Sequence, residues 1–188
     1  ATIRKGPITI AFIIMFLDVS QQGVWYSFIS LAAISVLAEL GFTLIVTQFV
    51  SHEYAHLRFY KGFIIGRRDN SEKLFSLIRY AFKFYIVVIP IAFILMTIWG
   101  YYILSPELSD YLYAWYCYSF ISAMQLFVSL MQSIYQGLDK VAIIYRHKTI
   151  GTISLVFITL PLLFLEFNIW ALVFSSLISL VIMSTLLY

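Results

Sequence analysis

The segment His52-Glu53-Tyr54-Ala55-His56 has the spacing of a zinc-protease motif. On a helix, two histidines four residues apart present both imidazoles on one face, and the glutamate beside the first acts as a general base. Such an enzyme also needs a third protein ligand and a position for water. The nearest downstream glutamate, Glu72, does not have the spacing of such a ligand. We therefore expect no metal, no cofactor and no catalytic activity, and keep an intramembrane zinc protease as a distant alternative.

A second candidate is Glu39, a carboxylic acid deep within an apolar run. In a continuous helix over 23–51, Ser35 and Thr43 would lie one turn to either side of it, and Thr47 one turn further along. A polar side chain in hydrocarbon is costly, so its presence indicates either a function or a hydrogen bond between helices. Two interpretations stay open: a carboxylate that faces a cavity, and a protonated side chain that joins two helices.

A third candidate is a stripe of uncharged polar residues in the run 110–137. Its members recur every three or four residues, which places them on one face of a helix. They are Ser122, Gln125, Ser129, Gln132 and Gln136. Amides and hydroxyls without charge suit hydrogen bonding to sugars, although contacts between helices use the same residue types. Both interpretations stay open.

Aromatic residues crowd the start of the same run. They are Tyr111, Tyr113, Trp115, Tyr116, Tyr118 and Phe120. Such a cluster is typical of the belt that Trp and Tyr form where a helix meets the membrane surface. Stacking against a sugar is the alternative.

The composition determines what kind of scaffold must position these residues. Of the 188 residues, 62% are hydrophobic and 11% are charged, whereas soluble domains have about 25% charged residues. At about 20 residues for each membrane-spanning helix, the length holds about six spans. The single cysteine, Cys117, excludes an internal disulfide and a cysteine-based metal site. We predict an all-α, polytopic transmembrane bundle.

The charges set the orientation of this bundle. We expect spans near 1–19, 23–51, 74–104, 110–137, 146–165 and 168–188. The Lys and Arg residues open the chain or follow the second and fourth apolar runs. In the other connections the charged residues are all Asp or Glu. The positive-inside rule then places both termini in the cytoplasm. Apolar residues alternate with basic ones in 52–73, which predicts an interfacial segment on the cytoplasmic leaflet in contact with membrane lipids, unless these charges only set the topology.

Three stretches of the sequence resemble a known transporter family. They are Gln22-Gly23-Val24-Trp25-Tyr26, Ala38-Glu39-Leu40-Gly41-Phe42 and Gln48-Phe49-Val50-Ser51-His52-Glu53. Together they are similar to the first helix pair of bacterial polysaccharide (O-antigen-type) flippases, which share a superfamily with the multidrug and toxic compound extrusion (MATE) transporters. Tyr135-Gln136-Gly137-Leu138-Asp139-Lys140 looks like that family's loop between the fourth and fifth helices.

The resemblance implies a lobe of a two-lobe transporter in the bacterial inner membrane. Family members have two lobes of six helices around a central cavity, and this chain resembles the first. The expected partners are a lipid-linked oligosaccharide on a polyprenyl diphosphate, membrane lipids, and either the missing C-terminal lobe or a second copy; no nucleic acid is expected. The sequence starts at Ala1 and ends in an apolar run at Tyr188, so we expect a piece of a longer chain.

The resemblance also assigns roles to particular residues. The predicted substrate cavity is lined by Glu39, Ser35, Thr43, Gln125, Ser129 and Gln132. Family members often place basic residues in the cavity for the diphosphate, and Arg79 and Lys83 are the candidates here, although both could instead extend to the membrane surface. A cation-coupled multidrug exporter of the same superfamily is the alternative function. It should show more than one carboxylate in the membrane, and only Glu39 qualifies.

Overall fold

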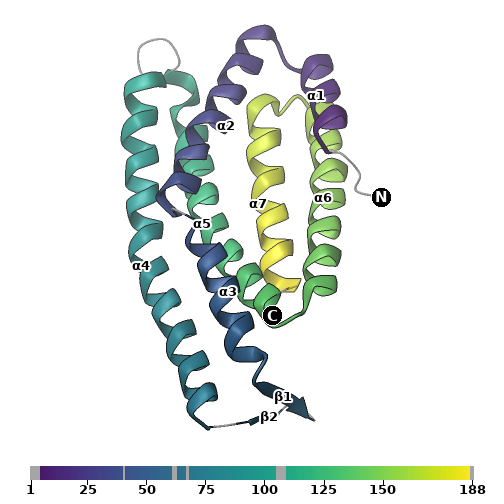
Figure 1. Cartoon of the computed structure of the whole chain (residues 1–188). Helices are drawn as coiled ribbons and strands as arrows, with labels where there is room; N and C mark the ends of the chain where they lie inside the picture. Colours follow the sequence, from purple (N-terminus) through teal and green to yellow (C-terminus); the bar gives the residue numbers. More distant parts are fainter. Residues whose placement is uncertain (1–4, 40, 61–62, 67, 105–108, 187–188) are drawn as a thin grey trace.

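The protein is a bundle of α-helices with a small β-hairpin at one end (Figure 1). The computed structural model describes residues 5–39, 41–60, 63–66, 68–104 and 109–186. Within this part of the chain the helices are α1 (Lys5–Phe16), α2 (Val19–Glu39), α3 (Phe42–Tyr54), α4 (Arg68–Leu104), α5 (Leu112–Gly137), α6 (Val141–Phe164) and α7 (Asn168–Leu186). A 3-10 turn, Ser109–Tyr111, precedes α5.

The hairpin lies between α3 and α4. Its strands β1 (Leu57–Tyr60) and β2 (Phe63–Gly66) are antiparallel, with Leu57 opposite Gly66 and Tyr60 opposite Phe63. The segment 52–73, predicted as one interfacial stretch, therefore contains the end of α3, this hairpin and the first turns of α4. Its position at a membrane surface stays a prediction.

The helices account for most, but not all, of the predicted spans. Helices α4, α5, α6 and α7 are each long and apolar enough to cross a membrane, and the bent pair α2 and α3 makes a fifth span if it is counted as one. A helical membrane protein is thus confirmed. Helix α1 has 12 residues, a length of about 18 Å against the hydrocarbon thickness of about 30 Å. The count of six spans stays a prediction.

The continuous helix predicted over 23–51 is wrong, because the chain breaks between α2 and α3. Gly41 has φ 72°, in the left-handed region that glycine enters without a steric penalty. The two helices are bent by 46° relative to each other. Thr43 and Thr47 therefore do not continue the straight row that begins with Ser35 and Glu39.

The helices approach closely where one of them carries a glycine. A Cβ built on Gly100 of α4 would lie 1.8 Å from Nε1 of Trp115 on α5. A Cβ on Gly137 of α5 would lie 2.6 Å from Val50 of α3. Trp115, predicted as part of a surface belt, is instead fully buried, and its Nε1 donates a hydrogen bond to the carbonyl of Met96 at 3.2 Å. Small residues at such crossings let helix backbones pack without a hydrophobic driving force.

The two ends of the bundle differ in charge. The lower end in Figure 1 carries the hairpin, the start of α4 and the turn between α5 and α6. Lys73, Lys140 and Arg146 lie at or near this end. At the upper end, the described connections carry Asp18, Asp110 and Glu166. The alternating direction of the helices thus gathers most of the described basic residues at one end, and the orientation of the bundle in a membrane stays a prediction.

Candidate functional site: a polar cavity between helices α2, α5 and α7

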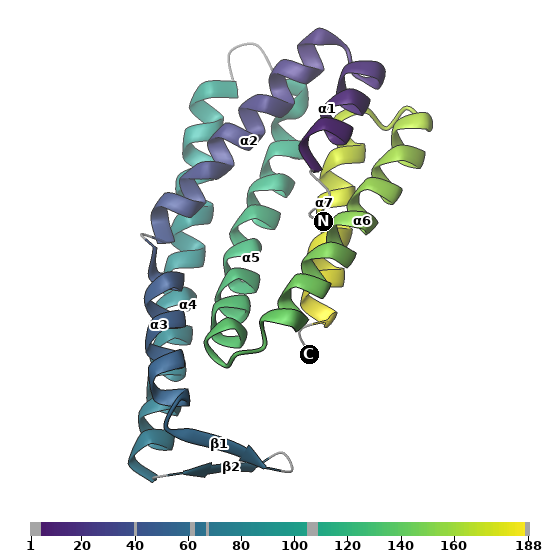
Figure 2. The ribbon, with the colours of Figure 1, turned by 45° about the vertical axis from the view of Figure 1, so that its right-hand side comes forward.

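The first site candidate is a half-open cavity of about 450 Å³ between helices of the bundle. Figure 2 shows α5 in the middle, with α2 and α3 on one side of it and α6 and α7 on the other. The cavity lies where α2, α5 and α7 face one another, with Leu155 contributed by α6. Its polar lining consists of Ser35, Tyr118, Ser122, Gln125, Ser176 and Ser179. We call this space the central cavity.

Three serine hydroxyls of the central cavity offer acceptors rather than donors to a ligand. The Ser35 hydroxyl donates a hydrogen bond to the carbonyl of Ala32 at 2.6 Å, and the Ser176 hydroxyl donates one to the carbonyl of Leu172 at 2.8 Å. Ser179 donates to the carbonyl of Gly151 at 3.1 Å. Each serine oxygen is left with lone pairs for a ligand, because a hydroxyl has one donor and two acceptor sites. The exposed amide of Gln125 supplies both donors and an acceptor.

No Lys, Arg, His, Asp or Glu is among the described residues that line the central cavity. Tyr118 is the one aromatic residue in the described lining. It stacks on Phe28 behind it, with ring centroids 5.7 Å apart, and meets Trp25 edge-on at 5.1 Å. These contacts hold the Tyr118 ring in place at the cavity wall. The rest of the described lining is apolar and consists of Ile29, Ala32, Ala33, Val36, Ile121, Leu155 and Met183. The site is therefore suited to a neutral ligand that combines apolar surface with hydroxyl groups.

The structure brings only part of the predicted site together. Ser35 and Gln125 line the central cavity. Ser129 and Gln132 follow Gln125 by one and two turns on α5 and are half-buried, outside the lining. Thr43 is half-buried in the first turn of α3, and its carbonyl accepts a hydrogen bond from Thr47 at 2.9 Å.

Four polar lining residues were missing from the predicted cavity. Ser122 was predicted only as a member of the polar stripe. Tyr118 was assigned to the surface belt, and Ser176 and Ser179 of α7 were not considered. Their signal in the sequence was a group of serines, with Ser175, inside an otherwise apolar run. That run by itself does not reveal which neighbour the serines face.

Glu39 lies outside the lining of the central cavity. It is the last residue of α2, is 6% exposed, and accepts a hydrogen bond from the hydroxyl of Tyr85 on α4. Just beyond the break, Phe42 stacks on Phe84 of α4, with ring centroids 4.2 Å apart. Both contacts attach the bend between α2 and α3 to α4. Of the two interpretations open for Glu39, this geometry favours the side chain that joins two helices.

Glu39→Gln is accordingly expected to fold normally, because the amide oxygen still accepts the Tyr85 proton. Glu39→Ala leaves a buried hydroxyl without a partner and is expected to lower the free energy of unfolding by about 2 kcal/mol. The stability of both variants is measured by thermal unfolding in detergent micelles. Tyr85→Phe should behave like Glu39→Ala, whereas Tyr80→Phe, at an exposed position of the same helix, should change nothing. Equal destabilisation by Gln and Ala would disprove the hydrogen-bonding role.

Arg79 and Lys83 are exposed on α4, which contributes no described residue to the central cavity. Their predicted contact with a diphosphate inside the cavity has no support in this arrangement. Extension to the membrane surface is the interpretation that the exposure favours.

No family model, curated protein or solved structure matches the chain. The resemblance to flippases therefore stays a prediction based on the sequence stretches given above.

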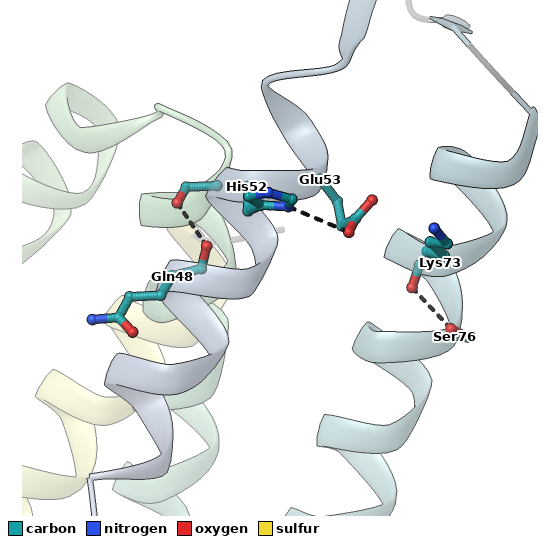
Figure 3. A network of polar contacts seen from close by, with 6 residues as sticks. Gln48, His52, Glu53, Lys73 and Ser76 are labelled. Carbon is teal, nitrogen blue, oxygen red and sulfur yellow. Dashed lines mark hydrogen bonds and ion pairs between the residues drawn. The ribbon is translucent and has the colours of Figure 1, made fainter.

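The zinc-protease motif lies away from the central cavity, at the end of α3 (Figure 3). His52 belongs to the last turn of that helix, but His56 follows its last residue, Tyr54. The two imidazole rings lie 5.5 Å apart between centroids, and Nδ1 of His52 lies 3.5 Å from Oε1 of Glu53. Among the described residues, no three His, Cys, Asp or Glu side chains are placed to hold a metal ion.

Proposed function

We propose that this chain is a lobe of a membrane transporter that moves a lipid-linked oligosaccharide across the bacterial inner membrane. The observation that carries the proposal is the central cavity, a half-open space between apolar helices whose described lining is uncharged and includes six polar side chains. Polar side chains at membrane depth mark substrate pathways by default, because they are costly without a partner. The resemblance of the sequence to flippases supports the same substrate class.

The lining suggests how a sugar would be accommodated. Moving a hydroxyl from water into an apolar medium without a hydrogen bond costs several kcal/mol, which is prohibitive for an oligosaccharide in bare hydrocarbon. The oxygens of Ser35, Ser176 and Ser179 accept hydrogen bonds from sugar hydroxyls. The Gln125 amide both donates and accepts hydrogen bonds. The polyprenyl tail stays in the lipid. A C-terminal lobe or a second copy closes the cavity on its open side, and rocking of the two parts gives alternating access.

Cysteine labelling tests both the cavity and its orientation. In a Cys117→Ser background of the full-length protein, Gln125→Cys is expected to react with a small charged thiol reagent, because a transport cavity is hydrated. Purified lipid-linked oligosaccharide should slow this reaction. Asp110→Cys should react from the outside and Lys140→Cys only from the inside, since the positive-inside rule places the basic end in the cytoplasm.

The control is Ile94→Cys, because Ile94 is 53% exposed on α4 and outside the central cavity. In a membrane this side chain faces lipid and should not react with a charged reagent. A Gln125→Cys protein as unreactive as Ile94→Cys would contradict a hydrated cavity. The reverse labelling of Asp110→Cys and Lys140→Cys would contradict the orientation.

A further inference from the structure

A second hollow of about 450 Å³ lies at the basic end of the bundle, and it shares no lining residue with the central cavity. Its described lining is entirely polar or ionisable: His52, Glu53, His56, Asn70 and Lys73. The first two side chains come from the last turn of α3, and the last two come from the first turns of α4. We call this hollow the polar pocket.

Most side chains of the polar pocket are hydrogen-bond donors. Lys73 is exposed, and among the described residues its ammonium group has no ion pair. The Asn70 amide and the imidazoles of His52 and His56 are further donors, the imidazoles at both nitrogens when they are protonated. Figure 3 shows the Glu53 side chain directed across the gap toward Lys73 on α4.

The one carboxylate in the pocket is already engaged. Oε1 of Glu53 lies 3.5 Å from Nδ1 of His52, and the Glu53 side chain is 17% exposed. This contact favours the proton on Nδ1 and leaves Nε2 of His52 directed elsewhere. The His52 side chain itself is 71% exposed, so it remains accessible to a ligand. The Glu53 carboxylate is thus engaged by an imidazole of its own helix, whereas among the described residues no ion pair engages Lys73.

We propose that the polar pocket binds a phosphate-bearing anion through Lys73, Asn70 and the two histidines. A compact anion with several acceptor oxygens matches donors that converge from two helices, and charge-assisted hydrogen bonds are the strongest of their kind. The surrounding segment 52–73 carries more Lys and Arg than Asp and Glu. The phosphate belongs to an anionic lipid headgroup or to a free phosphate, and the site does not depend on the transport function.

The test measures binding to the purified full-length protein in detergent micelles at pH 7, in two arms. One arm adds short-chain phosphatidylglycerol, with phosphatidylcholine for comparison, and counts retained lipids by native mass spectrometry. The other arm adds inorganic phosphate and follows binding by calorimetry. Lys73→Gln is expected to weaken binding about tenfold, because it removes one charge-assisted hydrogen bond. The matched control is Lys148→Gln, an exposed lysine on α6 outside the pocket, which should change nothing.

The Glu53→Gln variant tests whether the ligand is an anion. Removing the carboxylate should strengthen binding of an anion or leave it unchanged. Loss of phosphatidylglycerol alone in Lys73→Gln identifies a lipid headgroup as the ligand, and loss of inorganic phosphate alone identifies free phosphate. The proposal is overturned if neither probe binds, if Lys148→Gln weakens binding as much as Lys73→Gln, or if Glu53→Gln weakens it. None of these results bears on transport through the central cavity.

Discussion

Gly100→Ala is expected to destabilise the bundle by about 3 kcal/mol or more, because overpacking of a buried contact displaces side chains and backbone. The added methyl group would lie 1.8, 2.3 and 2.6 Å from three atoms of the Trp115 indole. Trp115 has no room to move aside, since it is fully buried and contacts Phe28 with ring centroids 5.1 Å apart. Any displacement also breaks its hydrogen bond to the carbonyl of Met96.

The matched control is Gly23→Ala in α2, where a Cβ would meet no heavy atom within 4 Å. Alanine is the better helix former by about 1 kcal/mol, so this variant should be as stable as the parent protein or slightly more stable. The measurement is the free energy of unfolding in mixed micelles. If both alanine variants unfold at the same denaturant concentration, this result would contradict the close approach of α4 and α5 at Gly100.

The helices could be predicted from the sequence because each long apolar run is bounded by charged or turn-forming residues. The break between α2 and α3 could not be predicted in this way. A single glycine such as Gly41 is tolerated within a helix at a modest cost, so it does not by itself indicate a break. The contacts of Glu39 with Tyr85 and of Phe42 with Phe84 hold the bend, and both partners lie more than 40 residues away in the chain.

The hairpin had a local signal that the interpretation of 52–73 did not use. Two short runs rich in apolar and aromatic residues, Leu57–Tyr60 and Phe63–Gly66, are separated by Lys61 and Gly62. Such a two-residue interval with a glycine is typical of a β-hairpin.

The candidate site was predicted in part, for a physical reason. Helical periodicity shows which polar residues share a face, and it correctly grouped Ser122 with Gln125 on α5. It does not show which helices enclose that face. The contribution of Ser176 and Ser179 from α7 depends on how α7 packs against α5 and α6, which is a property of the whole fold.

The largest functional effect is expected for Gln125→Leu. Leucine is close to glutamine in size and is an equally good helix former, so the fold should persist. The change removes the one exposed amide of the central cavity and with it the donors that complement the serine oxygens. Loss of about two hydrogen bonds to the sugar corresponds to a decrease of about tenfold or more in the transport rate.

Gln136→Leu is the matched control for this variant. Gln136 is an exposed amide on the same helix and belongs to the same polar stripe, but it lies outside the central cavity. The same chemical change there should leave transport near the parent level. Equal amounts of the two variant proteins in the membrane must be verified by immunoblotting.

The most direct measurement is the amount of surface polysaccharide on cells whose export depends on the full-length protein carrying each substitution. If sugars pass through the central cavity, Gln125→Leu cells should show about a tenth of the parent amount or less, while Gln136→Leu cells stay near the parent amount. Parent-level polysaccharide on Gln125→Leu cells, or an equal loss in both variants, would contradict the assignment of the central cavity as the substrate pathway.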